Sequence, residues 1–370
     1  MEFKIVKKDK DTQARLGVIF SPRGIIYTPC FFPVATRGVA KTLSSQDLLE
    51  CEVKGILCNA WHLFLRPKVE IIKHFGGLHN FMGWSGLIIT DSGGYQVFSL
   101  STLKEIQDIG VSFQSPIDGE KFFLSPQKVI DIQLDLDADV ILPLDECVGY
   151  PVSKEYALKS TKRTIRWARI SKERFLEKCQ DASKSLFCII QGSVYQDVRE
   201  FCQEELVKIE FDGYAVGGIS VGEPQNLKYK MFRDSIRYIP QGKIRYLMGI
   251  GKPLDLLEAV SLGYDIFDCI IPTRFGRTGT ALTWSGKVVI RNAQFSKEDE
   301  PLDSNCDCFV CRNYSRGYLR YLFNIEETLA MRLVSFHNVY FYVKFMEAIR
   351  ESIKQDKFLE FKQRYQNLEF

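Results

Sequence analysis

Short runs of apolar and β-branched residues recur along the chain, and each run closes on a polar residue or a glycine before a helix-like, amphipathic stretch. Apolar runs that alternate with helices are typical of parallel strands that are buried on both faces. Eight such units within about 250 residues predict an α/β fold of the (β/α)₈ TIM barrel type, with an open doubly wound sheet as the alternative. The eight runs lie at 30–35, 54–59, 86–91, 139–145, 186–191, 213–218, 245–249 and 265–270.

Three further segments depart from this alternation. Residues 1–29 carry no helix signal and predict an N-terminal antiparallel cap before the barrel, whose core we place at 30–271. Between the third and fourth runs, two strand-like segments flank the turn sequence at 116–119 and predict an oversized insertion. Residues 272–370 pass from a Gly- and Thr-rich stretch through a cysteine cluster into long helices, which predicts a helical, metal-bearing subdomain packed on the barrel.

Composition narrows the class of protein. Apolar residues make up 45% of the 370 residues and charged residues 26%, which is ordinary globular composition. The net charge of +3 excludes a polycation, so any nucleic-acid contact has to come from a local basic patch. No apolar run reaches the roughly 18 residues of a membrane helix. The charged run through Asp11 is neither a signal nor a transit peptide, and most of the eleven cysteines stand singly, so we expect a reduced, cytoplasmic protein without membrane contact.

Polar side chains gather at the ends of the predicted strands, which is where the active sites of such barrels lie. Asp91 closes the third run, Asp145 closes the fourth, and Asp268 lies late in the eighth. Gln191 closes the fifth run. One aspartate at such a place is commonly a helix N-cap. Several carboxylates that converge repel and desolvate one another, and folds keep them mainly where function requires it, so the sequence predicts a functional carboxylate site.

Two kinds of chemistry fit such carboxylates. Beside one sugar, one carboxylate can attack the anomeric carbon while the other manages the proton of the leaving group. Alternatively, two carboxylates can hold a divalent metal ion for hydrolysis. The scarcity of histidines argues against the metal site, because in the barrel segment only His62 lies close to a strand end. Glycine pairs suit close approach of a flat ligand, which Tyr95 and Met248 could sandwich if they are not plain core residues.

A cysteine cluster lies beyond the predicted barrel. Cys306, Cys308 and Cys311 form a C-x-C-x₂-C pattern, and His337 follows within a strongly helical stretch. Three thiolates and one imidazole complete a tetrahedral zinc site with no open position, so its role would be structural. The alternative is three unrelated cysteines and a core histidine. We therefore predict one structural Zn²⁺ per chain, which fastens the segment after the barrel to the C-terminal helix.

A basic stretch follows directly after Asp268, and it contains no acidic residue up to position 297. Such a stretch is typical of phosphate contacts, although a solvated loop is the alternative. A second basic run at 159–178 has the pattern of an ordinary exposed helix face. The basic residues of the first stretch are Arg274, Arg277, Lys287, Arg291 and Lys297.

Several long motifs occur in order along the chain, and together they resemble the tRNA-guanine transglycosylases of the bacterial branch. The resemblance covers nearly the whole chain, from 33–37 (PVATR) to the last helices. The motifs are 90–97 (TDSGGYQV), 145–147 (DEC), Gln191-Gly192, Gly217-Gly218 with Val221-Gly222-Glu223, 267–274 (FDCIIPTR) and the terminal cysteines with their histidine.

This resemblance implies a base exchange on tRNA. Guanine at wobble position 34 of tRNAs with a GUN anticodon, the acceptors of aspartate, asparagine, histidine and tyrosine, would be replaced by a 7-deazaguanine on the route to queuosine. Asp268 matches the nucleophile that attacks C1′ and forms a covalent intermediate. Asp91 matches the general acid/base that handles the proton of the leaving and entering bases. The resemblance also implies a homodimer.

The resemblance extends to the residues around the base. Asp145, Gln191 and Gly218 match groups that hydrogen-bond its guanine-like edge. Tyr95 and Met248 match the two faces of a base sandwich. The remaining positions implied for substrate contact are Ser92, Cys147, Ile219 and Glu223, and those for the anticodon loop are Arg274 and Arg277.

Two places in the sequence depart from the usual bacterial pattern. Ile219-Ser220 stands where Leu-Ala is common in bacteria, and Trp61 stands where Tyr is typical. The first change borders the pocket for the 7-substituent, so the incoming base is either the aminomethyl deazaguanine or the bulkier queuine. Cys147 and Val221 are bacterial-like and favour the smaller base.

Two alternatives stay within the same family. A non-catalytic partner subunit would be expected to lack a catalytic aspartate, whereas Asp91 and Asp268 are both present. An archaeal-type enzyme that modifies the tRNA core would call for an appended RNA-binding domain, of which the sequence shows no sign.

Overall fold

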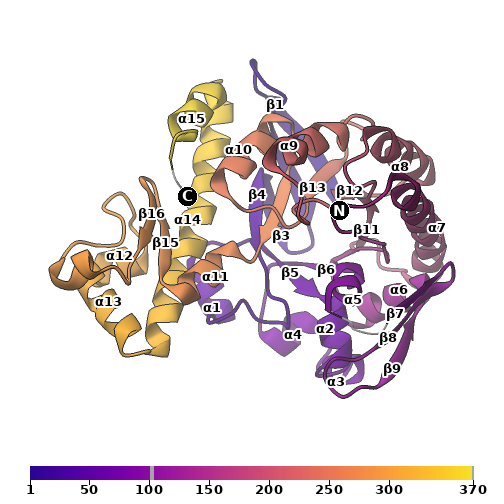
Figure 1. Cartoon of the computed structure of the whole chain (residues 1–370), viewed down its shortest axis with the longest axis horizontal. Coiled ribbons are helices and arrows are strands. Elements are labelled where there is room, and N and C mark those ends of the chain that lie inside the picture. Colours follow the sequence, from indigo (N-terminus) through magenta and orange to yellow (C-terminus); the bar gives the residue numbers. More distant parts are fainter. Residues whose placement is uncertain (101–103, 369–370) are drawn as a thin grey trace.

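An eight-stranded parallel sheet forms the centre of the computed structural model, which describes residues 1–100 and 104–368 (Figure 1). The strand order is β4-β14-β13-β12-β11-β10-β6-β5. A parallel bridge between Val34 and Leu57, with a hydrogen bond of 2.7 Å from the Ala35 N–H to the Leu57 carbonyl, joins the two ends of this order. The strands are β4 (Cys30–Pro33), β5 (Gly55–Asn59), β6 (Leu87–Asp91), β10 (Val140–Ile141), β11 (Ser185–Ile190), β12 (Gly213–Val216), β13 (Ile244–Leu247) and β14 (Ile266–Cys269).

This closure confirms the predicted (β/α)₈ barrel and excludes an open doubly wound sheet. The barrel strands are buried on both faces, as their continuous apolar runs predict. Inside the barrel, the rings of Phe32 and Phe187 fill the space over Gly55 and Gly213, where an added Cβ would lie 2.7 Å and 2.6 Å from ring atoms. Tyr246 belongs to the same interior cluster. The interior is therefore a packed core, and any site has to lie at one of its ends.

One predicted strand is much shorter than its apolar run. The run at 139–145 was expected to be a strand that ends at Asp145, but only Val140–Ile141 pairs with its neighbours. Pro143 has no N–H to give to a neighbouring strand, which is a physical reason for the early end. Asp145 consequently lies in irregular chain beyond the strand and remains buried.

Helices surround the barrel and alternate with its strands (Figure 1). The amphipathic stretches at 153–179 and 252–262 are confirmed as α7 and α10. Ser153 caps α7 by accepting from the Tyr156 N–H, and Pro253 begins α10. The helices between the strands are α1 (Ser45–Glu50), α2 (Ala60–Leu65), α3 (Val69–His74), α4 (Leu78–Met82), α5 (Gly94–Leu100), α6 (Pro126–Asp135), α7 (Lys154–Lys178), α8 (Gln196–Ile209), α9 (Gln225–Asp234) and α10 (Pro253–Ser261).

Two antiparallel sheets are added to the barrel. The N-terminal cap is confirmed as a three-stranded sheet of β1 (Glu2–Lys8), β2 (Arg15–Ser21) and β3 (Gly24–Thr28). The insertion after the third barrel strand holds three strands, where the sequence pattern had indicated two. They are β7 (Lys104–Gln107), β8 (Gly110–Gln114) and β9 (Lys121–Leu124).

The C-terminal part packs against the barrel through one long helix, α14, which Figure 1 shows along the flank opposite α7 and α8. The Tyr342 hydroxyl on this helix donates to the Gly251 carbonyl of the barrel, and Arg332 pairs with Asp47 of α1 at 2.7 Å. The long helices are as predicted, whereas the limits of the three parts of the chain stay predictions. The elements are α11 (Ile271–Thr278), β15 (Thr280–Thr283), β16 (Gly286–Val289), η1 (Ala293–Lys297), α12 (Phe309–Asn313), α13 (Arg316–Asn324), α14 (Thr328–Lys354) and α15 (Phe358–Tyr365).

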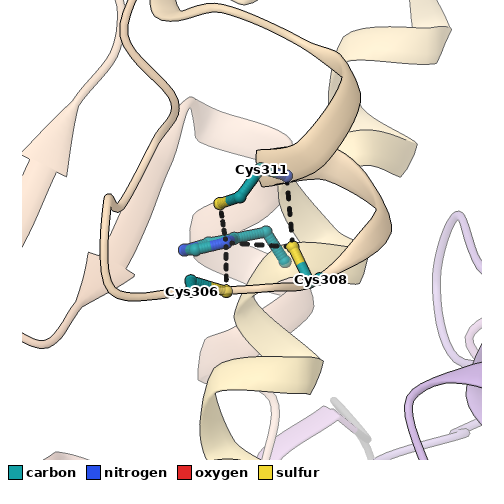
Figure 2. A group of neighbouring side chains, drawn as sticks. Cys306, Cys308 and Cys311 are labelled. Atoms are coloured by element: carbon teal, nitrogen blue, oxygen red, sulfur yellow. Dashed lines mark hydrogen bonds between the residues drawn. The ribbon is translucent and has the colours of Figure 1, made fainter.

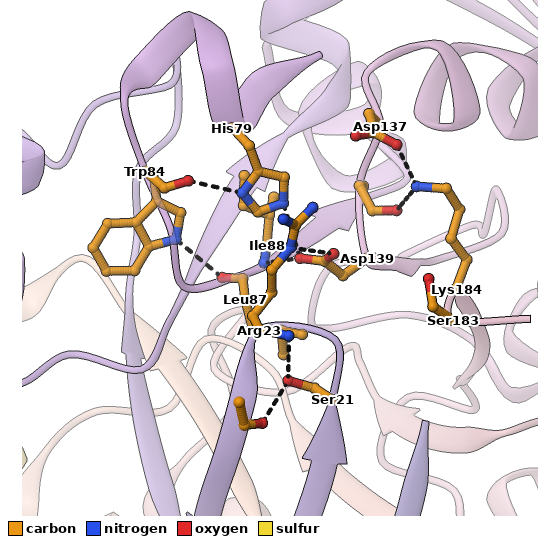
Figure 3. Close-up of polar contacts among 12 residues, drawn as sticks. Ser21, Arg23, His79, Trp84, Leu87, Ile88, Asp137, Asp139, Ser183 and Lys184 are labelled. Carbon is orange, nitrogen blue, oxygen red and sulfur yellow. Dashed lines mark hydrogen bonds and ion pairs between the residues drawn. The ribbon is translucent and has the colours of Figure 1, made fainter. Parts of the chain in front are cut away.

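The N-terminal ends of the barrel strands are closed by buried carboxylates. Asp139 precedes β10, and Figure 3 shows His79 from α4 and Arg23 from the turn between β2 and β3 pointing at it. The Arg23 Nε and the His79 Nε2 each lie 3.0 Å from an Asp139 oxygen, and the Ile88 N–H donates to it at 2.8 Å. Burial raises the pKa of Asp139, but these three partners outweigh it and hold the pKa below its ordinary value.

A second buried carboxylate joins the cap to the barrel base. Asp265 precedes β14, and Arg15 of β2 reaches it with Nε at 2.9 Å and Nη2 at 2.5 Å. The Arg245 N–H donates to the same carboxylate at 2.8 Å. This bidentate pair fixes the cap under the barrel.

None of the helices in the described part of the chain has the length and the apolar character that a membrane span needs.

Candidate active site

Asp91 ends β6, directly beside the end of β5, because the two strands pair in register from Gly55 to Asn59. The Asn59 amide donates to Asp91 Oδ2 at 2.6 Å, and the N–H groups of Ala60 and Gly93 lie 3.3 Å from Oδ1. All three donors are neutral. Burial raises the pKa of Asp91 to about 7, with the charge of Asp268 adding to the rise and the hydrogen bonds opposing it.

Asp268 lies on β14 at the same end of the barrel, and its side chain is buried. The Tyr246 hydroxyl donates to Oδ1 at 2.6 Å, and the Gly249 N–H donates to the same oxygen at 2.9 Å. Burial raises the pKa of Asp268 to about 6, against the opposing effect of these two hydrogen bonds. Both carboxyls thus carry pKa values near neutrality, which is the property that acid/base and nucleophilic chemistry requires.

Sequence reasoning missed the partners of both aspartates. Asn59 closes the second apolar run, so the rule that selected Asp91 as a strand-end residue could have found it. Tyr246 gave no such signal, because a tyrosine within the run at 245–249 has the pattern of a core residue. Only the closed barrel brings its hydroxyl to Asp268.

Asp145 forms a separate buried group with two neutral partners. The Ser92 hydroxyl donates to its Oδ1 at 2.9 Å, and the Gln191 amide donates to its Oδ2 at 2.7 Å. Burial raises the pKa of Asp145 and the hydrogen bonds oppose the rise. The Gln191 Oε1 is buried and has no partner among the described residues. A ligand with both donors and acceptors on one edge matches this arrangement.

Glycines bring the backbone close to this group. A Cβ on Gly94 would lie 2.5 Å from Asp145 Oδ1, and one on Gly218 would lie 2.3 Å from Gln191 Oε1. Gly218 also has a φ of +63°, which disfavours any side chain. The glycine requirement at both positions is therefore steric, as expected for a flat ligand bound against the backbone.

The loop after Gly218 is fixed by an internal carboxylate. Ile219 is buried, and Glu223 accepts from the Ser220 N–H at 2.6 Å and the Val221 N–H at 2.9 Å. Nearby, burial raises the pKa of the Cys147 thiol to about 12, with the charge of Asp145 adding to it. A thiol in this state is uncharged at neutral pH, so Cys147 is present as a small neutral side chain.

The two residues expected to sandwich a ligand differ in exposure. Tyr95 on α5 is 53% exposed, whereas Met248, directly after β13, is partly buried against the barrel interior. Arg274 is exposed on α11, which follows β14 and so starts at the same barrel end as Asp268. Arg277 donates its Nε to the Thr273 carbonyl at 3.2 Å. Their roles stay predictions.

One expectation about basic residues needs correction, and another basic residue has internal contacts. Arg291 donates to the carbonyls of Thr278 and Phe323 and packs over the Phe323 ring at 4.9 Å, while phosphate contact by its stretch stays a prediction. The run at 159–178 is not a wholly exposed face, because the Arg163 side chain is only 8% exposed and pairs with Glu146. The guanidinium of Arg163 on this helix thus offsets the charge of the buried Glu146 carboxylate.

The predicted metal ligands come together away from the strand ends. The ligand atoms of Cys306, Cys308, Cys311 and His337 all lie within 4.8 Å of one another. His337 Nδ1 lies 3.8, 3.6 and 3.3 Å from the three sulfurs in chain order. Figure 2 shows the side chains of Cys306, Cys308 and Cys311 gathered around a common centre. His337 Nε2 faces the Leu282 carbonyl at 2.9 Å, which orients the ring with Nδ1 toward the sulfurs. Four soft and borderline donors in this arrangement fit a metal ion that prefers tetrahedral thiolate and imidazole ligands.

Taken together, these features define a class. A closed (β/α)₈ barrel carries buried carboxylates with neutral donors at one end and a cluster of three cysteines and a histidine outside it. This combination is that of a barrel enzyme with carboxylate chemistry and a separate metal-binding cluster.

Comparisons with known proteins then identify the family. A family model described as queuine tRNA-ribosyltransferase matches residues 9–369. Proteins named queuine tRNA-ribosyltransferase from Thermoanaerobacter sp. (strain X514) and Caldanaerobacter subterraneus subsp. tengcongensis are 47% and 48% identical over 365 residues, which cover 99% of this chain and 96% of each relative. One from Staphylococcus aureus (strain JH9) is 46% identical over 368 residues, with coverage of 98% and 95%. The chain belongs to the queuine tRNA-ribosyltransferase family, and it is an enzyme of the transferase class.

Proposed function

We propose that this enzyme exchanges guanine at wobble position 34 of GUN-anticodon tRNAs for a 7-deazaguanine, through a covalent bond between Asp268 and the ribose. The observation that carries the proposal is the pair Asp91 and Asp268 at one barrel end. Asp268 is buried and Asp91 is partly buried, and among the described residues only neutral donors bond to them. The family of the chain supports the same reaction. A partner subunit without activity would have no need of two carboxyls with pKa values near neutrality.

The first displacement uses the two carboxyls in different forms. We assign the ionised form to Asp268 and the protonated form to Asp91, whose pKa is raised by burial and further by the charge of Asp268. The Asp268 carboxylate attacks C1′ while the bond from C1′ to the base breaks. Asp91 gives its proton to the departing guanine, so the base leaves in its neutral form.

The second displacement reverses these roles. The incoming base attacks C1′ with its ring nitrogen, and the bond between C1′ and Asp268 breaks. Asp91 takes the proton from that nitrogen and returns to its starting form. Two displacements at one carbon retain its configuration, and the enzyme follows ping-pong kinetics because guanine leaves before the second base enters.

The base has to leave the stack of the anticodon loop to reach this site. We assign its polar edge to Asp145, Gln191 and Gly218, whose neutral and anionic groups supply the donors and acceptors of a guanine-like edge. Tyr95 and Met248 are assigned to its two faces. Arg274, exposed on α11, and Arg277 are assigned to anticodon-loop phosphates.

The identity of the incoming base depends on the loop after Gly218. Cys147 and Val221, which match the bacterial pattern, support the aminomethyl deazaguanine over queuine. Offering both bases in competition to tRNA with guanine 34 tests this choice. Preferential incorporation of queuine would contradict it.

The cysteine and histidine cluster is assigned to one structural Zn²⁺. A zinc ion there would hold the loop that carries Cys306, Cys308 and Cys311 to α14 through His337, because these ligands come from both segments. Metal analysis should give one zinc per chain, and a strong chelator should lower the thermal midpoint. A chain that purifies without zinc and is as stable as before chelation would contradict the assignment.

A second copy of the chain is the proposed partner protein. Apolar side chains on and after α13 are exposed, with Tyr321 at 56% and Ile325 at 48%. We propose that this surface belongs to a homodimer interface. Sedimentation should give a dimer, and Tyr321→Lys should shift it toward the monomer. Because tRNA is the proposed substrate, we place the enzyme in the cytoplasm.

The central test is an exchange assay. Labelled guanine should enter tRNA that carries guanine 34 but not tRNA with another base there. Without an incoming base, the enzyme should release guanine and remain covalently attached to the tRNA on a denaturing gel. Loss of attachment in Asp268→Asn, with guanine exchange intact, would contradict the assigned nucleophile.

A further inference from the structure

Both hydrogen bonds to the Asp268 carboxylate go to one oxygen. The Tyr246 hydroxyl at 2.6 Å and the Gly249 N–H at 2.9 Å both donate to Oδ1. Within the described residues, no hydrogen bond to Oδ2 is present. The two oxygens of this carboxylate are therefore not equivalent, because one is held by two donors and the other is left for a reaction partner.

We propose that Tyr246 is a positioning residue that holds Oδ1 of Asp268, so that Oδ2 attacks the ribose, and that the same hydroxyl stabilises the carboxylate when it leaves. This inference rests on the proposed base exchange and deepens it. It assigns a task to a side chain that otherwise has the pattern of plain barrel core.

The bonds of each step define that task. In the first displacement, the bond from Oδ2 to C1′ forms, the bond from C1′ to guanine breaks, and the base takes its proton from Asp91. In the second, the bond from C1′ to Oδ2 breaks and its electron pair returns to the carboxylate. Negative charge then returns to the carboxylate and is shared by its two oxygens. The Tyr246 hydroxyl stabilises the charge on Oδ1 by donating a hydrogen bond to it.

The surroundings explain why a tyrosine is needed there. Tyr246 is fully buried in the otherwise apolar barrel interior, where an unpaired hydroxyl would be unfavourable. The only hydrogen-bond partner of the Tyr246 hydroxyl among the described residues is Asp268. Phenylalanine would fill the same space, so packing alone gives no reason for the hydroxyl.

The charges around Asp268 determine what removal of the hydroxyl does. The titratable groups near it are Asp91 on β6, Tyr246 on β13 and Cys269 on β14, and Cys58 on β5 lies near Asp91. Burial raises the pKa of Asp268, and Tyr246 is the larger of the two opposing influences. Without Tyr246 the pKa rises further, so the ionised nucleophile is lost at a higher pH.

The test compares Tyr246→Phe with Tyr264→Phe in the full-length enzyme. Tyr264 is also fully buried, but its hydroxyl donates to the Phe232 carbonyl at 2.9 Å, outside the proposed site. Formation of the covalent adduct with tRNA is followed without an incoming base. Its breakdown is followed after addition of labelled guanine, and both rates are measured from pH 5 to 9.

We expect Tyr246→Phe to slow breakdown about 10-fold or more at high pH, the effect of a lost hydrogen bond to a charged group. The acidic limb of adduct formation should move up by about one pH unit. Tyr264→Phe should change neither. A ring-fluorinated tyrosine at position 246 is a stronger hydrogen-bond donor, so it should move the acidic limb of adduct formation to lower pH. This second variant tests the role of the hydroxyl even if Tyr246→Phe folds poorly.

Two results would overturn the proposal. If Tyr246→Phe and the fluorinated protein both keep the unsubstituted pH profile and breakdown rate, Tyr246 is only a packing residue. If the unsubstituted enzyme forms no adduct, the proposed function fails and this role fails with it. The first result leaves the proposed function intact, so the two failures are distinguishable.

Discussion

Buried carboxylates have different hydrogen-bond partners at the two ends of the barrel. Asp265, just before β14, and Asp268, within it, are one example of each kind. Asp265, just before the strand, is paired with the Arg15 guanidinium through two hydrogen bonds. Asp268, within the strand, accepts from the Tyr246 hydroxyl and a backbone N–H and, in the described part of the chain, from no cation. Both side chains are buried. Burial alone therefore does not distinguish a structural carboxylate from a reactive one.

The same contrast appears between β6 and β10. Arg23 and His79 face Asp139 at the base, and the pKa of Asp139 lies below its ordinary value. At the other end, the donors to Asp91 among the described residues are all neutral, and its pKa is raised to about 7. A cationic partner stabilises the ionised form in a way that a neutral donor does not, so the charge of the partner decides the role. Substitutions at either end test this difference.

The largest effect is expected from Asp268→Asn. Removal of the proposed nucleophile should lower base exchange by about four orders of magnitude or more, because no other group can form the intermediate. The free energy of unfolding at pH 8 should not fall, since the variant removes a buried charge that has no cationic partner. Exchange kinetics and urea unfolding check both halves. A large loss of stability would mean that the two barrel ends do not differ as described.

The matched change at the other end is Asp265→Asn. It leaves the Arg15 guanidinium buried without its partner, so the free energy of unfolding should fall by about 3–5 kcal/mol. Base exchange by the folded fraction should change little. Asp265 lies at the N-terminal end of the barrel strands and contacts no proposed substrate-binding residue among those described. Urea unfolding at pH 7 measures the loss. If Asp265→Asn were as stable as the unsubstituted enzyme, the pair would not fix the cap.

The pH dependence of stability should have opposite signs at the two ends. The pKa of Asp91 is 3.8 ordinarily and about 7 in the folded protein, so the folded state keeps its proton longer. Its contribution to stability is therefore lost as pH rises between these values. The pKa of Asp139 is lowered, so its contribution is present at neutral pH and is lost only as pH falls below about 4.

Two variants separate these contributions. Asp91→Asn should become more stable relative to the unsubstituted enzyme as pH rises from 5 to 8, with Asp268 leaving part of the slope in place. Asp139→Asn should be less stable than the unsubstituted enzyme throughout that range, because the ionised Asp139 loses its partners. Unfolding free energies at several pH values test this pair, and parallel curves for the two variants would contradict it.

The smallest effect is expected among the ion pairs at the N-terminal end of the barrel strands. The Arg23 side chain is 31% exposed, whereas that of Arg15 is 3% exposed. Solvent screens the exposed pair, so Arg23→Met should lower stability by less than about 1 kcal/mol. Arg15→Met should lower it several-fold more. Equal losses of stability from the two variants would show that solvent exposure does not determine how much each ion pair at this end contributes.

Much of this architecture was predictable because the signals are local. Eight apolar runs predicted the barrel, and the spacing of Cys306, Cys308 and Cys311 predicted a metal cluster whose atoms do come together. The strand-end rule selected Asp91 and Asp268, which the structure places at one barrel end. The rule failed in detail for Asp145, since Pro143 ends the pairing before that residue is reached.

The partners of these carboxylates were not predictable, because they come from distant segments. Arg15 and Asp265 are 250 residues apart in the chain, and Asn59 and Asp91 are 32 apart. Arg163 has the pattern of a surface residue, yet α7 directs it onto the buried Glu146. No periodicity in the sequence records which strand end a helix or a cap will cover.

The fold class, the family motifs and the set of ionisable groups available for chemistry follow from the amino-acid sequence alone. Hydrophobic periodicity and short ligand spacings depend on neighbours in the chain, and a local pattern is enough to detect them. The partner of each carboxylate, a cation or a neutral hydroxyl or amide, follows only from the folded chain. It depends on burial and on contacts across the closed barrel, and it separates Asp268 from Asp265.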